Sequence, residues 1–123
     1  MAIQIEKKEK CVIVTPNVDK LDSSISPSLK SELIMANADG SKNIILNMHH
    51  VKYCDSSGLS AVLIGNRICR NSHGTFVLCA LQSEVARLIT ISQLDRIISI
   101  TPTISEAEDL IIMDEVGRET EEE

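Results

Sequence analysis

Two continuous apolar runs limit the fold of this chain more than any other feature. Ile44-Ile45-Leu46 and residues 75–80 (TFVLCA) lack the polar alternation of a half-exposed strand. Unbroken apolar runs of this length are typical of strands that are covered on both faces. A helical pattern lies between them, and strands that alternate with helices predict an α/β fold with one sheet and several helices.

The remaining segments predict a mixed sheet of four to five strands packed with about four helices. Residues 3–5 and 11–15 read as neighbouring strands that form an antiparallel hairpin, and residues 97–100 as a short last strand. Four helices are expected: from Ser26-Pro27 to about Asp39-Gly40, from Gly58 to about Asn71, from Ser83 onward, and from Thr103 onward. Ser26 and Ser83 are predicted caps, and Thr103 with Glu106 forms a capping box.

Length and composition indicate one domain, residues 1–113, with a core of its own. The chain has 123 residues and no apolar run long enough for a membrane span, and the N-terminus lacks the apolar centre of a signal peptide. A cytoplasmic protein is therefore expected. The four cysteines form no CxxC pair and lie in apolar contexts, which favours buried, reduced thiols.

Most of the net charge of −6 comes from the C-terminal segment. Residues 114–123 hold six acids against Arg118 alone, which leaves the body near neutrality. We predict a solvated, disordered acidic tail over residues 114–123. Nucleic-acid binding is not expected, because the sequence has no basic stripe and its only aromatic residues are Tyr53 and Phe76.

The stretch YCDSSGLSAVL, residues 53–63, places an acid, two hydroxyls and a glycine between an apolar run and a helix. Asp55, Ser56 or Ser57 can cap that helix, but one cap is enough. The additional oxygens leave three explanations open: capping alone, a nucleophile, or a hydroxyl that accepts a phosphate.

A nucleophilic or metal site is the weaker reading of this stretch. Serine hydrolases need a base near the serine and an oxyanion hole, and no G-x-S-x-G elbow is present, although His49, His50 and His73 are available. The spacing HHxxxCD matches no standard set of metal ligands.

A phosphate on a serine at this helix start is compatible with the fold. It adds about −1.5 to −2 charges near the positive end of the helix dipole, where the first backbone amides are expected to stabilise it. Helical projection places Leu59 and Leu63 between the buried and solvent-facing sides, next to Asn66 and Arg70. These leucines form either a partner-binding patch or a surface that a neighbouring helix covers.

The motif Asn47-Met48-x-x-Val51-x-x-x-Asp55-Ser56-Ser57-Gly58-Leu59 resembles the signature of STAS domains, in particular the anti-sigma factor antagonists of bacteria. The resemblance extends from Leu21-Asp22 through Phe76–Ala80 and residues 83–98. Two positions depart from it: the segment 16–22 lacks the family's glycine, and Gln93 stands where Ser-Gly-Leu is frequent, which is expected to affect a turn.

The resemblance implies a binding module and not an enzyme. Ser56 would be phosphorylated by an anti-sigma factor that is also an ATP-dependent serine kinase, and a metal-dependent serine phosphatase would reset it. No cofactor, metal, nucleic acid or membrane is expected to bind. The implied partner-binding and site-shaping residues are Asp22, Asp55, Ser57, Gly58, Leu59, Leu63, Asn66 and Arg67. The alternatives are a STAS subunit of a transporter or stress complex without phosphorylation, and a hydrolase that uses Ser56.

Overall fold

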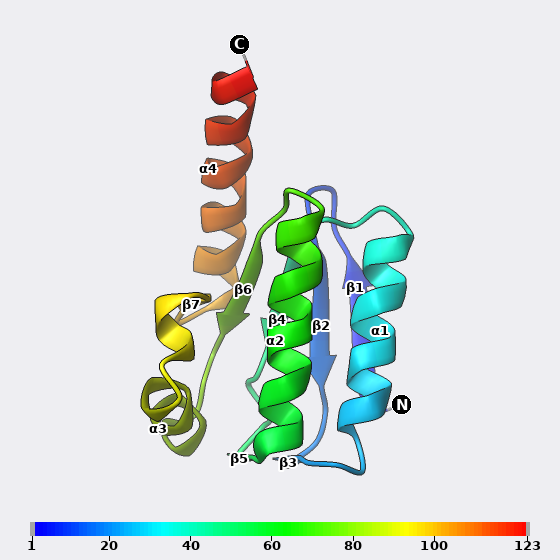
Figure 1. Cartoon of the computed structure of the whole chain (residues 1–123), viewed down its shortest axis with the longest axis vertical. Helices are drawn as coiled ribbons and strands as arrows, with labels where there is room; N and C mark the ends of the chain where they lie inside the picture. The colour runs from blue at the N-terminus through cyan, green and yellow to red at the C-terminus, as the bar shows by residue number, and fades with distance from the viewer. Residues whose placement is uncertain (1, 123) are drawn as a thin grey trace.

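A five-stranded mixed sheet with helices on both faces forms the body of the protein (Figure 1). The computed structural model describes the backbone of residues 2–122 and the side chains of residues 2–119. The strand order is β1-β2-β4-β6-β7; β1 and β2 are antiparallel and the other pairs are parallel. The strands are β1 Ile3–Lys7, β2 Val12–Pro16, β4 Ile44–Asn47, β6 Phe76–Cys79 and β7 Ser99–Thr101. The predicted α/β fold, mixed sheet and N-terminal hairpin are confirmed.

Four α-helices flank this sheet within residues 2–122, and a short second sheet lies at the end toward which β2 points (Figure 1). The helices are α1 Ser26–Ala38, α2 Ser56–Asn71, α3 Ser83–Ile91 and α4 Ile104–Glu122, with a 3₁₀ turn at Leu94–Arg96. The second sheet pairs β3, Lys20–Leu21, with β5, Tyr53–Cys54, in parallel. It lies directly before the first residue of α2 and therefore fixes where that helix begins.

Two apolar clusters confirm that the central strands are buried on both faces. Alternate residues of β4 point to opposite sides: Ile44 and Leu46 pack with α1, α2 and α3, whereas Ile45 packs with Ala107 and Ile111 of α4. All four cysteines are free and buried in these clusters. Burial raises the pKa of Cys69 to about 12 and those of Cys54 and Cys79 to about 11, so these thiols are unreactive apolar side chains.

Three helix and strand starts differ from the sequence-based expectations. Ile25, and not Ser26, is the cap residue of α1, because Ser26 lies inside the helix and its hydroxyl donates to the carbonyl of Asp22. Ser83 likewise lies inside α3 and does not cap it. The last strand begins at Ser99, because the amides of residues 97 and 98 donate to the carbonyl of Leu94 and so belong to the preceding turn.

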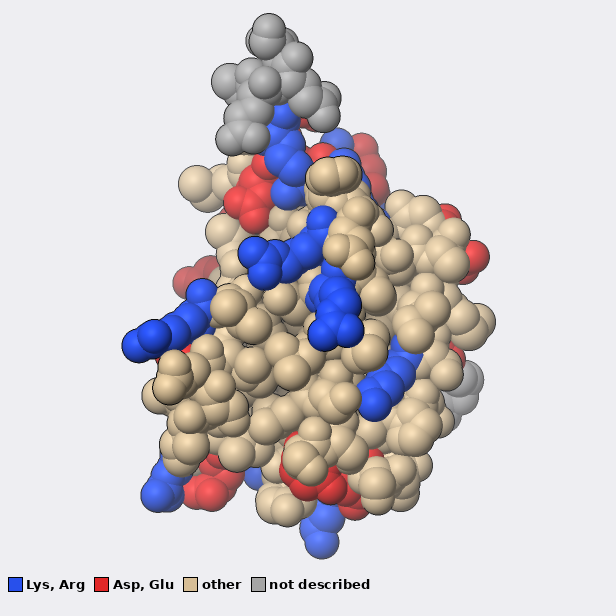
Figure 2. Space-filling model, viewed as in Figure 1, with Lys and Arg blue, Asp and Glu red and all other residues tan. Residues whose placement is uncertain are grey.

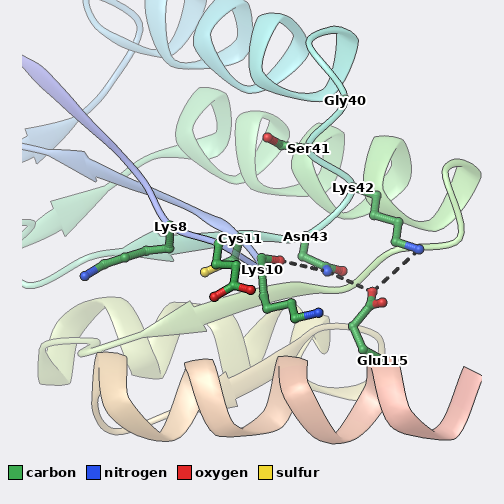
Figure 3. A pocket seen from close by; sticks show the side chains of 9 residues that line it. Lys8, Lys10, Cys11, Gly40, Ser41, Lys42, Asn43 and Glu115 are labelled. Carbon is green, nitrogen blue, oxygen red and sulfur yellow. Dashed lines mark hydrogen bonds and ion pairs between the residues drawn. The ribbon is translucent and has the colours of Figure 1, made fainter. Parts of the chain in front are cut away.

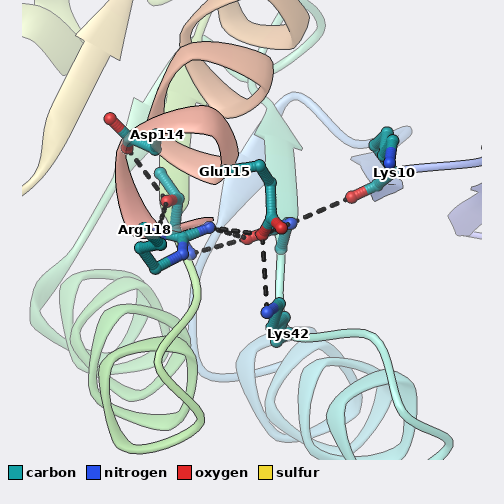
Figure 4. A network of polar contacts seen from close by, with 7 residues as sticks. Lys10, Lys42, Asp114, Glu115 and Arg118 are labelled. Carbon is teal, nitrogen blue, oxygen red and sulfur yellow. Dashed lines mark hydrogen bonds and ion pairs between the residues drawn. The ribbon is translucent and has the colours of Figure 1, made fainter. Parts of the chain in front are cut away.

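The predicted disordered tail is wrong for the described part of residues 114–123, because α4 continues to Glu122. Asp114, Glu115 and Arg118 lie on one face of α4 and bond to side chains at the starts of β4 and β6 (Figure 4). Glu115 accepts from Asn43 Nδ2 at 2.9 Å, and Thr75 Oγ1 donates to Asp114 at 2.9 Å. Part of the acidic segment therefore makes specific contacts with the body of the protein. Glu123 lies outside the described residues.

Glu115 makes the stability of the protein depend on pH in a defined acid window. Its pKa is lowered to about 2, first by the hydrogen bond from Asn43 and then by that from Arg118. A lowered folded-state pKa stabilises the protein above the unfolded value, and this stabilisation is lost as the pH falls from about 4.5 toward 2. Glu115→Gln should lower the unfolding free energy at pH 7 by on the order of 1 kcal/mol.

The difference in unfolding free energy between Glu115→Gln and wild type, measured by urea titration, should become smaller as the pH falls through this window. Glu119→Gln, on an exposed position of the same helix, should leave the unfolding free energy at pH 7 unchanged. If the difference in unfolding free energy between Glu115→Gln and wild type were the same at all pH values, the contacts of Glu115 would contribute nothing to acid sensitivity.

Gln93 adopts a left-handed backbone conformation, with φ 61° and ψ 20°, at the turn after α3. This agrees with the expectation that the residue affects a turn. Left-handed backbone disfavours residues with a Cβ. Gln93→Gly should therefore raise the unfolding free energy by about 0.5–1 kcal/mol. Ser92→Gly, next to it at φ −78°, should lower it in the same denaturation assay, and a lower stability for Gln93→Gly would refute the argument.

Candidate functional site at the start of helix α2

Asp55 is the residue that caps α2. Its Oδ1 atom accepts hydrogen bonds from the backbone amides of Ser57, at 2.9 Å, and Gly58, at 3.1 Å. It also accepts from the Ser57 hydroxyl at 2.6 Å. The hydrogen bond from that hydroxyl is the main cause that lowers the pKa of Asp55, with the Gly58 amide next. Of the three candidate caps, the structure therefore selects the acid.

Ser57 connects the starts of two helices. Its hydroxyl lies 3.1 Å from that of Ser26 in α1, whose own hydroxyl donates to the carbonyl of Asp22. The Asp22 carboxylate in turn accepts from the amide and the hydroxyl of Ser24, and the hydroxyl bond is the main cause that lowers the pKa of Asp22. Ser57 and Ser26 therefore link the starts of α2 and α1, while the Asp22 carboxylate bonds within its own turn. Ser26 is a member of this network that the sequence did not reveal.

Gly58 permits a close approach between α2 and the small sheet. A Cβ atom at this position would lie 2.5 Å from Cys54 Sγ and 2.6 Å from the carbonyl oxygen of Leu21. Both distances are far shorter than van der Waals contact. The glycine of the motif is therefore required by packing against β3 and β5.

Ser56 is the exposed residue of the motif. It is the first residue of α2 and lines a surface pocket of about 390 Å³. The other pocket residues are Tyr53, Cys54, Asp55, Leu59, Glu84 and Leu88. Tyr53 is 52% exposed, whereas Leu59 and Leu88 are half-buried. Glu84 and Leu88 come from α3, so nothing local in the sequence places them next to Ser56.

The electrostatics at Ser56 differ from the expectation in one respect. The first amides of α2 were expected to stabilise an added anion, but those of Ser57 and Gly58 already donate to Asp55. A phosphate on Ser56 would therefore be placed beside Asp55 and Glu84 at the protein surface. Added charge at this corner would share the pocket with two carboxylates, and two of the first amides of α2 are already engaged.

Leu59 and Leu63 are both half-buried and pack against the core, so part of each side chain is covered and part remains accessible. Leu59 lies in the pocket with Ser56. Leu63, Asn66 and Arg67 line a separate depression further along α2. The structure thus divides the expected partner surface into two hollows on one helix. Asn66 is only 7% exposed, so its side chain forms part of the wall of this depression and offers little surface to a partner.

Among residues 2–119, no histidine forms a hydrogen bond with the Ser56 hydroxyl. His49 and His50 instead contact each other, with ring centroids 4.7 Å apart. No group of three or more His, Cys, Asp or Glu side chains among the described residues is arranged to hold a metal ion.

Comparison with known proteins agrees with this fold. The STAS domain family model matches residues 2–107, and the chain belongs to the STAS domain family. Its structure is similar to that of a Thermotoga maritima protein assigned as an anti-sigma factor antagonist. The TM-score is 0.83 at 27% identity, and the match covers 89% of this chain and 93% of that one.

Two further solved structures share the fold at lower identity. The Bacillus cell fate determinant SpoIIAA in its phosphorylated form matches with a TM-score of 0.70 at 23% identity, over 89% of this chain and 99% of that one. The murine anion transporter Slc26a9 matches with a TM-score of 0.70 at 16% identity, over 88% of this chain and 18% of that one. Among residues 2–122, no helix combines the length and apolar character that crossing a membrane requires.

Proposed function

We propose that this protein is an anti-sigma factor antagonist whose binding is switched off by phosphorylation of Ser56. The observation that carries the proposal is the position of Ser56: an exposed hydroxyl in the first turn of α2, beside a partly apolar pocket formed with Leu59 and Leu88. The partner is an anti-sigma factor with ATP-dependent serine kinase activity. The kinase binds the ATP, so the antagonist itself is a substrate that needs no cofactor. A serine phosphatase removes the phosphate.

The switch follows from the charges already present at this corner. Asp55 and Glu84 line the same pocket as Ser56, and the amides of Ser57 and Gly58 already donate to Asp55. A phosphate adds about −1.5 to −2 charges at the rim of the pocket. A partner that rests on Leu59 and Leu88 would have to bury this charge without a counter-ion, which costs several kcal/mol. The exposed position of Ser56 lets the phosphate form without any change in the core.

Phosphate mapping tests this proposal. The chain is incubated with ATP and candidate serine kinases from the same genome, and the product is analysed by peptide mass spectrometry. A single phosphate on Ser56 is expected, with none on Ser57, whose hydroxyl donates to Asp55. Ser56→Ala should remain unmodified. Phosphate on another serine, with Ser56 untouched, would contradict the proposal.

A second candidate is a STAS module in a larger assembly, such as a transporter, in which phosphorylation has no part. The match to a domain-sized part of Slc26a9 supports it, since that fold occurs there as 18% of a longer chain. Affinity purification from the native organism distinguishes the two candidates. An antagonist should co-purify with a kinase of the anti-sigma type, and a transporter module with a membrane protein, in both cases identified by mass spectrometry.

A further inference from the structure

A groove between α2 and the segment before β7 has a chemistry that differs from the Ser56 pocket. Its lining residues are Leu63, Asn66, Arg67, Arg70, Asn71 and Ile97, and its volume is about 370 Å³. We call it the α2–β7 groove. Its volume lies at the lower end of the range of ligand pockets, roughly 300–1,000 Å³. It therefore has room for side chains of a bound segment but not for a folded element.

The rim of the α2–β7 groove carries uncompensated positive charge. Arg67 and Arg70 are exposed, and neither forms an ion pair with a carboxylate among the described side chains. Figure 2 shows basic side chains gathered over the upper half of α2, while acidic side chains lie at its lower end. The chain as a whole has a net charge of −6, so this concentration of basic side chains on one face is opposite in sign to the rest of the protein.

A second pocket with several lysines shows the contrast. It lies at the edge of the sheet near the β1–β2 turn and holds Lys8, Lys10 and Lys42 (Figure 3). Lys8 pairs with Glu6 at 3.1 Å, and Lys42 pairs with Glu115 at 3.6 Å. Its charge is thus partly neutralised within the chain, whereas that of Arg67 and Arg70 is not.

The floor of the α2–β7 groove is aliphatic. Leu63 is half-buried and Ile97 is 48% exposed, so both present apolar surface between the arginines. No aromatic side chain lines the groove, which disfavours single-stranded nucleic acid, because such binding relies on base stacking. Arginine guanidinium groups pair bidentately with carboxylates, and an aliphatic floor accommodates a branched side chain.

An adjoining hollow extends the positive surface. It shares Asn66, Arg70 and Ile97 with the α2–β7 groove and adds Arg118 from α4. Arg118 is paired with Glu115, but its buried Nε atom has no hydrogen-bond partner. Asp114 also lines this hollow, so the strongest attraction for an anion lies at Arg67 and Arg70.

We propose that the α2–β7 groove docks an acidic segment of a partner protein, with an aliphatic side chain on Leu63 and Ile97 and carboxylates on Arg67 and Arg70. The inference deepens the proposed function, because Leu63, Asn66 and Arg67 belong to the expected partner surface. It adds a second contact that is independent of Ser56. The partner is thus recognised at this groove by acidic charge and released at the helix start by phosphate.

The test is an NMR titration of the full, unphosphorylated chain with a short peptide of glutamate and leucine. A lysine–leucine peptide and a single-stranded oligonucleotide are the comparison probes. We expect chemical-shift changes to concentrate at residues 63–71 and 97 with the acidic peptide only. Arg67→Glu and Arg70→Glu should each weaken binding about tenfold, equivalent to 1.4 kcal/mol. Arg87→Glu is the charge-matched control, since this exposed arginine lies on α3 outside the groove, and should change binding less than twofold, within roughly 0.4 kcal/mol.

Several outcomes would overturn the inference: no shift changes in the groove, an equal response to the lysine–leucine peptide, or equal effects of Arg87→Glu and Arg67→Glu. Preferential binding of the oligonucleotide would replace a protein partner by a nucleic acid. Because no kinase is present and Ser56→Ala should bind the peptide as wild type does, a failure here leaves the Ser56 switch untouched. Absence of phosphate on Ser56, with peptide binding intact, would remove only the switch.

Discussion

Ser56→Asp is expected to weaken binding of the anti-sigma partner by about ten- to a hundredfold while the fold is retained. Ser56 lines the pocket with Leu59 and Leu88, so a docked partner excludes water from this corner. The new carboxylate would share the pocket with Asp55 and Glu84, and the amides of Ser57 and Gly58 already donate to Asp55. Isothermal titration calorimetry with the purified partner measures the loss, and circular dichroism reports the fold.

Ser105→Asp is the matched control for this effect. Ser105 is also an exposed serine in the first turn of a helix, but α4 lies on the opposite face of the sheet. It receives the same charge in a similar helical position and should leave partner binding unchanged. Equal weakening by the two variants would show that net charge, and not the position of Ser56, controls binding.

Gly58→Ala is expected to lower the unfolding free energy by about 2–3 kcal/mol. The added methyl group would lie 2.5 Å from Cys54 Sγ and 2.6 Å from the Leu21 carbonyl oxygen. The carbonyl belongs to β3, whose pairing with β5 fixes the start of α2, so neither neighbour moves without disturbing the site. Urea denaturation measures the change.

Gly117→Ala is expected to raise the unfolding free energy in the same assay. Gly117 lies in α4, and a Cβ atom added there would have no other side chain or distant backbone within 4 Å, so alanine gains helix propensity without a clash. It should stabilise the protein by up to about 1 kcal/mol. If Gly58→Ala were as stable as wild type, the close approach between α2 and the small sheet would not constrain the motif.

The sequence predicted those parts of the fold that depend on local pattern. The apolar runs at residues 44–46 and 75–80 correctly indicated strands buried on both faces. This inference rests on the absence of polar alternation, because a strand covered on both faces needs apolar residues at successive positions. The position of Asp55 before the first turn likewise made it one of three candidate caps.

Features that depend on contacts between distant segments were missed. Composition suggested a disordered tail, but Glu115 and Arg118 bond to Asn43, more than seventy residues earlier. Glu84 and Leu88 of the Ser56 pocket come from α3 and carry no local signal. Each case requires knowledge of which side chain lies opposite in space, which periodicity alone does not contain.

The most direct measurement compares the affinity of one anti-sigma partner for the phosphorylated and the unphosphorylated wild-type chain. We expect the doubly charged group to reduce affinity by at least a hundredfold, about 2.7 kcal/mol, with amide NMR shifts altered only around the start of α2. Equal affinities for both forms would contradict a switch at Ser56. So would a loss of binding accompanied by shift changes throughout the sheet, because the phosphate would then act by unfolding the domain.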